Sequence, residues 1–407
     1  MAMELYLQFG YGMMGHIRHL LERWNGGTAI LSPRDLTDVQ LRQLSDDLRD
    51  IDGGKVLLDP QFFLPHADHE RLCAHDYWPN DYWPNDYETG VFWQGPALAQ
   101  LIDRIYALNA DLGTSAVILP GLLATQIDDG WLSAQTAFLD RARSVNSNQD
   151  IMMTIALNSD VLRDQRQVGE LIEAAETWRA PGYYLVFEHP NGEYLVSDSI
   201  WLANALDIVA GLRLMSTNVV VGYSNHQMLV AGLSGATAIA SGTWMNVRSF
   251  PPDKFRANYE EEIRQRATWY YCSASMSEYK ITFLDAAQRM NVLDTMAPMD
   301  DGGYADILFS GAQPTSTNFG ESNAFRHYLN ALRSQADAIT KPSFDSTVDD
   351  YQMMLDQAEA TQGTLHAAQI RGQQRDFGEY FDINRAAIAV LTSTRGQILK
   401  RSWGALT

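Results

Sequence analysis

The sequence is poor in cysteine and in lysine. Its 407 residues include two cysteines, Cys73 and Cys272, and five lysines. Two cysteines are too few for a disulfide framework and fit a reducing compartment. The shortage of lysine leaves 30 basic residues against 50 acidic ones, a formal net charge of −20. Because proteins that follow a phosphate backbone gain affinity from Lys/Arg surfaces, this balance disfavours nucleic acid as a partner and favours a protein or a small molecule.

Long apolar runs are absent as well. No stretch of eighteen apolar residues occurs, and the N-terminus lacks the basic-then-apolar pattern of a leader. We therefore expect no membrane span and a cytoplasmic location. The composition that remains, with 46% hydrophobic and 20% charged residues, is typical of a globular protein.

Short apolar runs alternate with amphipathic ones through the first part of the chain. Eight runs are strand-like and helical crossovers separate them, which predicts an α/β fold, a (β/α)8 TIM barrel over residues 1–250. An open doubly wound sheet is the alternative. Residues 251–407 are mostly helical and polar and predict a C-terminal helical extension. The eight strand-like runs are LYLQF, TAILS, KVLLD, SAVIL, DIMMTIAL, GYYLVF, NVVVG and ATAIAS.

In a parallel barrel, functional side chains lie at the carboxyl ends of the strands. Two carboxylates, Asp59 and Glu188, follow strand-like runs and would point into one mouth. Such a pair can divide acid and base roles when burial separates the two pKa values. The alternative is that one of them caps a helix or pairs with an arginine. Other polar or aromatic residues at these ends are Asn158, His189, Tyr223, Ser224, Ser241, Thr243 and Trp244.

Potential metal ligands gather in HADHERLCAH, residues 66–75. His66, Asp68 and His69 are ligand types, and the two histidines would share one face of a helical turn. No recognised zinc spacing fits the segment, so we expect no metal and interpret it as a solvated loop. A metal-dependent hydrolase that uses these three residues is the outside alternative. GHIRH, residues 15–19, is interpreted as a surface face of a helix.

The last strand-like run leads into GTWMNVRSF. An exposed Gly-Thr-Trp turn that ends in Arg248 could bind an anion through backbone N–H groups and the guanidinium. A packed aromatic turn with a structural arginine is the alternative. The sequence pattern does not decide whether Arg248 binds an anion or has a structural role.

Residues 218–250, NVVVGYSNHQMLVAGLSGATAIASGTWMNVRSF, resemble one stretch of the tRNA-guanine transglycosylase family. Gly222 matches the glycine at the family's strand end, and Arg248 matches the arginine that closes the motif. KVLLDPQFF resembles the strand before Asp-Ser-Gly-Gly-Phe-Gln. This match places Asp59 on the aspartate that serves the family as acid/base at the exchanged base. The likeness covers residues 50–280 and implies the same barrel.

Several of the family's motifs are incomplete in this chain. The family's nucleophilic aspartate falls near Ala240 or Ser241, and its second base-recognising aspartate falls near Gly121. YCSASMSEYKITFLDAAQRM resembles the family's Cys-X-Cys-X-X-Cys zinc segment near residues 270–292, but only Cys272 matches a cysteine. The resemblance therefore implies a lost zinc site, no cofactor and a lost standard exchange reaction.

DYWPNDYWPNDY, residues 76–87, repeats a five-residue unit where the family inserts a hairpin beside the substrate mouth. Tyr77, Trp78, Tyr82 and Trp83 supply large contact areas on a loop that proline stiffens. The aspartates of the loop repel phosphate, so we expect it to bind a protein surface or a basic peptide. A slipped duplication without a role is the alternative.

The resemblance implies a transglycosylase-like protein of bacterial anti-phage defence, similar to the accessory type in type IV CBASS operons. It would bind guanine or a 7-deazaguanine together with a protein partner from the operon, and take part in nucleobase modification. Asp59 and Glu188 would act at the base, as catalytic residues if activity survives. The expected base-binding residues are Asn158, Gly222, Tyr223, Trp244 and Arg248.

Two other functions stay open. One is an active pentosyltransferase that exchanges a 7-deazaguanine into DNA or tRNA, with Asp59 or Glu188 replacing the missing nucleophile. The other is a non-catalytic scaffold whose barrel presents the aromatic loop to a partner. A nucleic-acid acceptor and a homodimer are compatible with the sequence, although the acidic charge disfavours the acceptor.

Overall fold

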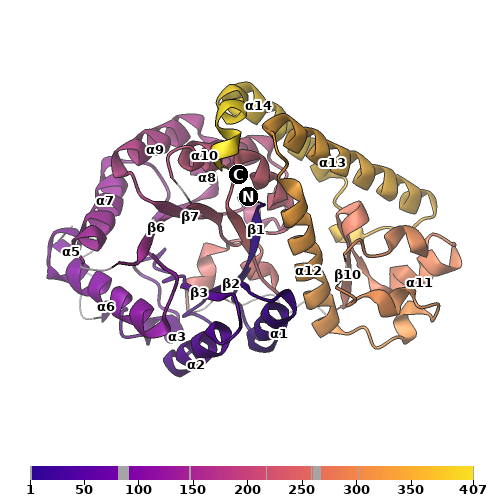
Figure 1. Ribbon diagram of the computed structural model, residues 1–407, viewed down its shortest axis with the longest axis horizontal. Coiled ribbons are helices and arrows are strands. Elements are labelled where there is room, and N and C mark those ends of the chain that lie inside the picture. Colours follow the sequence, from indigo (N-terminus) through magenta and orange to yellow (C-terminus); the bar gives the residue numbers. More distant parts are fainter. Residues whose placement is uncertain are drawn as a thin grey trace.

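The computed structural model describes residues 2–80, 91–145, 148–216, 218–257, 259, 267–300 and 302–406. A curled sheet of parallel strands forms its centre, in the order β3-β2-β1-β9-β8-β7-β6-β4, with β5 paired to β6 (Figure 1). The strands of this sheet are β1 Glu4–Gln8, β2 Gly27–Leu31, β3 Gly54–Leu58, β4 Ala116–Ile118, β5 Leu123–Ala124, β6 Asp150–Leu157, β7 Gly182–Phe187, β8 Asn218–Val221 and β9 Ala238–Ser241.

The predicted α/β fold with eight parallel strand positions is confirmed. The strands follow one another in chain order around the curl, because β1 pairs with β2 on one side and with β9 on the other. The strands β3 and β4 end the series, and the described residues show no ladder between them. One backbone bond joins these ends, from Ser115 N–H to Val56 O at 2.9 Å. Strand pairing therefore gives a curled, barrel-like sheet, and it does not establish the closed TIM barrel that the sequence predicts.

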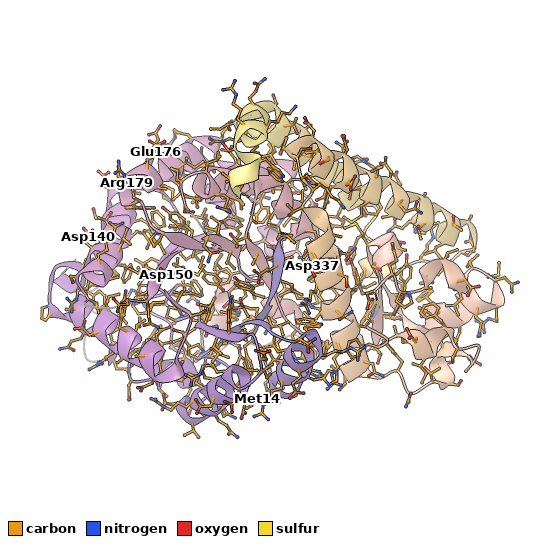
Figure 2. The ribbon with its side chains drawn as sticks, viewed as in Figure 1. Met14, Asp140, Asp150, Glu176, Arg179 and Asp337 are labelled. Atoms are coloured by element: carbon orange, nitrogen blue, oxygen red, sulfur yellow. The ribbon has the colours of Figure 1, made fainter. Side chains whose placement is uncertain are left out.

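Helices follow the strands and cover the outside of the sheet, which explains why the strands are apolar on both faces. Figure 1 shows α6, α7 and α9 along this outer side. Their charged residues face outward, as Asp140 on α7 and Glu176 on α9 show in Figure 2. These helices are α1 Met14–Trp24, α2 Asp38–Arg49, α3 Glu70–Cys73, α5 Val91–Gln94, α6 Pro96–Leu112, α7 Asp129–Ser144, α8 Ser159–Arg163, α9 Gln165–Trp178 and α10 Ser199–Arg213.

Side-chain caps fix where several of these helices begin. Thr37 starts α2 with a capping box, in which its hydroxyl accepts the Gln40 N–H at 3.3 Å. Asp164 and Asp198 cap α9 and α10 in the same way, by accepting backbone N–H groups of the first turn. Because each helix follows a parallel strand, such helix starts lie toward the edge of the sheet where functional residues gather in this class of fold.

The predicted helical C-terminal part is confirmed, and it also contains an antiparallel hairpin. A second apolar core lies under this hairpin and includes Tyr270, Cys272 and Leu284. Helix α14 returns to the barrel-like part, where Arg395 Nε binds Asp207 Oδ1 at 2.7 Å. The elements are β10 Trp269–Cys272, β11 Ser277–Lys280, α11 Ile281–Arg289, α12 Glu321–Ile339, α13 Phe344–Ala367 and α14 Glu379–Leu406.

Nine short 3-10 helices connect the main elements within the described ranges. The longest of them replaces the helix expected between β8 and β9. None of the helices that the structure describes is long and apolar enough to span a bilayer. The 3-10 helices are Pro190–Gly192, His226–Ser234, Met245–Val247, Pro252–Phe255, Ser273–Ser275, Leu293–Met296, Asp306–Phe309, Pro314–Ser316 and Gln373–Arg375.

Candidate functional site

Asp59 lies directly after β3 and is the centre of a buried polar cluster. Its side chain is 1% exposed. Oδ1 accepts the Gln61 backbone N–H at 2.9 Å. Oδ2 accepts two tyrosine hydroxyls, from Tyr223 at 2.8 Å and from Tyr184 at 3.2 Å. We call Asp59, Tyr184, Tyr223, Gln61 and Gln8 the Asp59 cluster.

The members of the Asp59 cluster come from strands on opposite sides of the curled sheet. Tyr184 belongs to β7, and its hydroxyl lies 3.0 Å from Gln8 Oε1 at the end of β1. Gln61 Nε2 donates to Tyr223 Oη at 3.2 Å. Gln8 Nε2 is buried and has no hydrogen-bond partner among the described residues. Whichever way this amide is oriented, a buried polar group beside the carboxyl therefore remains available to a ligand or a water.

The acidity of Asp59 reflects this environment. Burial raises its pKa from 3.8 to about 6, and the hydrogen bonds from Tyr223 and Gln61 and the charge of Lys254 offset part of that rise. Burial, followed by the Asp59 charge, raises the pKa of Tyr184 and Tyr223 well above 10.0. At neutral pH the cluster thus presents an ionised carboxyl that neutral tyrosines hold in place. The ionised carboxylate can accept hydrogen bonds from N–H and O–H groups of a ligand.

Gly222 makes room for the Tyr184 hydroxyl. A Cβ at this position would lie 2.5 Å from Tyr184 Oη, which is closer than van der Waals contact allows. The bulkier side chain would push the tyrosine away from Asp59. The residue after it, Tyr223, has a positive φ of 51°, which turns its ring toward the carboxyl.

We expect Gly222→Ala to lower the free energy of unfolding by about 1–3 kcal/mol, because the Cβ overpacks the Tyr184 contact. Gly169→Ala is the matched control, since its Cβ would meet nothing within 4 Å in the middle of α9. That change should raise stability by about 0.5–1 kcal/mol. Urea denaturation of both variants measures the difference, and equal stability of the two would contradict the packing argument.

Glu188 and Asn158 form a second polar group at the same edge of the sheet. Glu188 follows β7, and its Oε2 accepts the Ser159 N–H at 3.2 Å. Burial, together with the charges of Asp160 and Asp253, raises its pKa. Asn158 Oδ1 caps α8 by accepting the Val161 N–H at 2.9 Å. Glu188 is thus a half-buried carboxyl at the start of α8, where helix N–H groups stabilise its charge.

Two of the predicted base-binding residues lie in other surroundings. Arg248 is buried beside Glu278 at 3.6 Å, and its guanidinium carbon lies 3.5 Å from the centre of the Tyr328 ring. Trp244 donates its indole N–H to Tyr11 O at 2.9 Å. The structure therefore brings Asp59, Gly222 and Tyr223 together and Asn158 next to Glu188. It places Arg248 in an ion cluster with Glu278 and Arg375, so base binding by Arg248 stays a prediction.

The aromatic repeat is only partly described, and its first two aromatic side chains are buried. The Tyr77 hydroxyl donates to Pro60 O at 2.7 Å, and the Trp78 ring lies 5.1 Å from the Phe62 ring. They are therefore core residues, and their interpretation as a partner-binding surface is wrong. Tyr82 and Trp83, predicted for the same surface, lie outside the described residues.

The potential ligands of residues 66–75 make local structural contacts. His75 Nε2 lies 2.9 Å from Pro33 O, and the Cys73 thiol donates to Ala67 O at 3.1 Å. Asp68 Oδ1 accepts the Ala257 N–H at 2.6 Å. In the part of the chain that the structure describes, no group of three His, Cys, Asp or Glu residues is arranged to hold a metal. The segment is thus bonded to its surroundings, in contrast to the solvated loop that was expected.

Two members of the Asp59 cluster, and the lysine beside it, carried no recognised signal in the sequence. Tyr184 and Gln8 sit within apolar strands, and their meeting depends on how far the sheet curls. Lys254 is buried after β9, where its Nζ donates to Asn246 O at 2.9 Å and lies 3.9 Å from the centre of the Tyr223 ring. A lysine in an apolar turn of a lysine-poor chain is the one available hint. An open depression of about 570 Å³ lies elsewhere, beside α2 and α6.

The fold and this cluster define a barrel-like α/β protein with a buried carboxyl–tyrosine site at one edge of its strands. No protein-family model matches the chain, and no curated protein matches it. Among solved structures, the carboxyl transferase domain of Rhizobium etli pyruvate carboxylase is similar over 96% of this chain and 78% of that chain, at 10% identity and a TM-score of 0.34. A variant of that domain with pyruvate covers 97% and 78% at 11% identity and a TM-score of 0.36. Likenesses of this size assign neither an activity nor a substrate.

Proposed function

We propose that this chain is a transglycosylase-like protein of bacterial anti-phage defence that binds guanine or a 7-deazaguanine base. On this proposal the sheet closes as a (β/α)8 barrel across the contact between Ser115 and Val56, and the base sits at its mouth. Its protein partner would come from the same defence operon. The resemblance of residues 50–280 to the tRNA-guanine transglycosylase family supports the proposal.

The observation that carries the proposal is the Asp59 cluster. An ionised carboxyl accepts the N–H groups of the guanine donor edge in charge-assisted hydrogen bonds. The unpartnered amide group of Gln8 supplies a further polar contact beside it. Because Tyr184 and Tyr223 now occupy Oδ2, the base would replace at least one of their hydroxyls on binding. The tyrosine rings would then offer flat surfaces for stacking.

The residues at the end of β9 are compatible with a protein that binds a base but does not carry out the family's base-exchange reaction. Ala240 and Ser241, where the family's nucleophilic aspartate would fall, are both buried and carry no carboxyl group. An active pentosyltransferase would have to use Asp59 or Glu188 for covalent attack on the ribose. Mass spectrometry after incubation with tRNA or DNA would reveal such an adduct, which binding alone does not produce.

The residues of the former zinc segment do not fit a zinc ion. Cys272 is the only cysteine there, and it pairs with Ser277 across the β10–β11 hairpin. Structural zinc sites need four ligands, mostly thiolates and imidazoles. Cys272 instead packs into the second apolar core with Tyr270 and Met296.

Calorimetric titration with guanine and with 7-cyano-7-deazaguanine tests the proposed function. We expect binding in the micromolar range for the wild-type protein. Asp59→Asn should abolish it, Glu188→Gln should weaken it, and the exposed control Asp140→Asn should leave it unchanged. Circular dichroism at the titration temperature shows whether each variant is folded.

A non-catalytic scaffold is the second candidate, and one observation favours it. Asp59 is almost fully buried and already accepts three hydrogen bonds, as a purely structural carboxyl would. Absence of heat with either base, for a wild-type protein that is fully folded, would favour the scaffold and reject base binding.

A further inference from the structure

One segment of the loop after β9 crosses the edge of the sheet where Asp59 lies. Residues 249–255, SFPPDKF, which we call the mouth segment, contact residues at the ends of several strands. Phe250 forms a parallel bridge with Glu188, directly after β7. Lys254 O accepts the Nε–H of Arg34, which follows β2, at 2.7 Å. The mouth segment therefore runs from the end of β7 to the end of β2.

An aromatic ring and a lysine of the mouth segment pack against the Asp59 cluster. The Phe250 ring lies 5.2 Å from the ring of Tyr223 and 4.9 Å from that of Phe63, in the loop after β3. Lys254 Nζ lies 3.9 Å from the centre of the Tyr223 ring. Because the Tyr223 hydroxyl donates to Asp59 Oδ2, these contacts place the mouth segment against a direct partner of the carboxyl.

The burial of these side chains describes a closed site. Phe250, Lys254 and Phe255 are each 1% exposed, and so is Asp59. A ligand cannot reach a carboxyl with so little exposed surface, so a covering element has to move before a ligand enters. Parallel ladders hold the strands β3, β7 and β8 in the sheet. The mouth segment is joined to the sheet by an isolated bridge and folds into a short 3-10 turn, so it is the element that opens at the lowest cost.

Lys254 gives the mouth segment a charge that suits both a closed and an open position. In the closed position its Nζ donates to Asn246 O at 2.9 Å. Burial raises the pKa of Asp59, and the charge of Lys254 is among the effects that offset this rise. Burying a cation costs free energy, and part of that cost is recovered when the lysine returns to water. A charged residue in the segment therefore makes opening easier than it would be for an entirely apolar cover.

We infer that the mouth segment is an autoinhibitory plug, which closes the Asp59 cluster in the free protein and moves away when a base binds. Its second half rests on the base binding proposed above, whereas closure concerns the free protein alone. Arg248, the residue before the mouth segment, is held by Glu278 of the hairpin, so the C-terminal part fixes one end of the plug.

Carbodiimide labelling of the full chain tests closure without a ligand. The reagent couples glycine ethyl ester to accessible carboxyl groups, and peptide mass spectrometry gives the rate at each of them. In the wild-type protein Asp59 should react about tenfold or more slowly than Asp140, which points outward on α7 (Figure 2). Phe250→Ala should raise the Asp59 rate by about tenfold, because the plug loses its ring contacts with Tyr223 and Phe63. Phe250→Leu, which keeps an apolar side chain, should give an intermediate rate.

Phe344→Ala is the matched control for lost core packing. Phe344 is 1% exposed, like Phe250, and its ring packs on Trp403 between α13 and α14. This variant should leave the Asp59 rate unchanged, and circular dichroism confirms that each variant is folded during labelling. The inference is overturned when wild-type Asp59 reacts as fast as Asp140, or when Asp59 stays protected in both Phe250 variants. An equal rise in Phe344→Ala also overturns it, because general destabilisation would then explain the exposure.

Calorimetric titration with guanine tests the link between the plug and binding. A plug that must open lowers the apparent affinity by the fraction of molecules that are open, so Phe250→Ala should bind guanine about tenfold more tightly than the wild-type protein. Equal affinity of the two would overturn the link. Absence of heat in both, together with faster labelling of Asp59 in Phe250→Ala, would reject base binding at the cluster and support the plug.

Discussion

Raising the pH from about 3 to about 7 is expected to cost the wild-type protein about 3 kcal/mol of unfolding free energy relative to Asp59→Asn. The pKa of Asp59 rises from 3.8 to about 6 in the folded protein, mainly through burial. Each pKa unit corresponds to about 1.4 kcal/mol, so the two units carry the expected effect. Asparagine has the same shape and does not titrate.

The direction follows from proton linkage. Between 3.8 and about 6 the folded protein keeps the Asp59 proton while the unfolded chain has lost it. The folded state then binds more protons than the unfolded state, so stability falls as the pH rises. The contribution is fully present below 3.8 and is lost once the pH passes the folded pKa of about 6.

Two buried histidines make the variant comparison necessary. Burial lowers the pKa of His189 and of His226 to about 4. Their unfolded pKa of 6.5 means that stability rises with pH over nearly the same interval, opposite to the Asp59 effect. A wild-type curve by itself sums both contributions, whereas the difference from Asp59→Asn isolates the carboxyl.

Urea denaturation at half-unit pH steps measures this difference, with the exposed Asp140→Asn variant as the control. The wild-type minus Asp59→Asn difference should fall steadily with pH and then level off near pH 7. A difference that is constant across the range would show that Asp59 titrates alike in both states. That result would remove the argument that the site holds a carboxyl tuned by burial.

The strand ends of this chain could be predicted because a local pattern determines them. A run such as KVLL has the apolar composition of a buried parallel strand, so the residue after it, Asp59, must lie at the carboxyl edge. The same reasoning placed Glu188 and Tyr223 correctly at that edge. What this pattern cannot show is how deeply a residue is buried there.

The hydrogen-bond partners of these residues could not be predicted, because they lie far away in the sequence and a local pattern carries no information about them. Tyr184 reaches Asp59 across 125 residues, because the sheet curls enough to bring β7 opposite β3. The burial of Tyr77 and Trp78 was missed for a related reason. The composition of the repeat DYWPN suggests an exposed loop. In its first unit, however, Trp78 packs against Phe62 and Tyr77 donates a hydrogen bond to Pro60 O, just after β3. Long-range packing overrode the local signal.

The ion partners of Arg248 could not be predicted because they lie far along the chain. Glu278 is on β11, and Arg375 is 97 residues beyond it, in the segment before α14. The sequence left a structural arginine as the alternative, and the geometry favours that alternative. Tyr194 completes the arrangement by donating its hydroxyl to Glu278 Oε1 at 3.2 Å. The loop after β9, the hairpin and the final segment are thereby joined by one ion cluster.

Glu278→Gln is expected to lower the free energy of unfolding by about 3–5 kcal/mol, because it breaks a buried ion cluster from one side. Glu278 is 2% exposed and pairs with both Arg248 and Arg375. Burial by itself would raise its pKa, but the charges of Arg375 and Arg248 outweigh burial and lower it. Removing the carboxylate leaves the buried Arg248 cation without its counter-charge.

The pH dependence has the opposite sign to that of Asp59. Because the folded pKa of Glu278 is below the usual 4.5, its contribution is present above 4.5 and is lost as the pH falls through the folded value. Urea denaturation at neutral pH therefore measures the full penalty. Glu176→Gln, an exposed change of the same chemistry on α9, should alter stability by less than about 0.5 kcal/mol.

A double variant separates the charge imbalance from the loss of hydrogen bonds. Glu278→Gln with Arg375→Gln removes one cation along with the carboxylate, so it should recover part of the loss. If the double variant is less stable than Glu278→Gln by the full Arg375→Gln effect, the two residues are uncoupled and the cluster is not held by charge. Recovery would instead establish that the C-terminal part is bound to the barrel-like part through the charges of Arg248, Glu278 and Arg375, and that the single carboxylate between the two cations holds the loop after β9 in position.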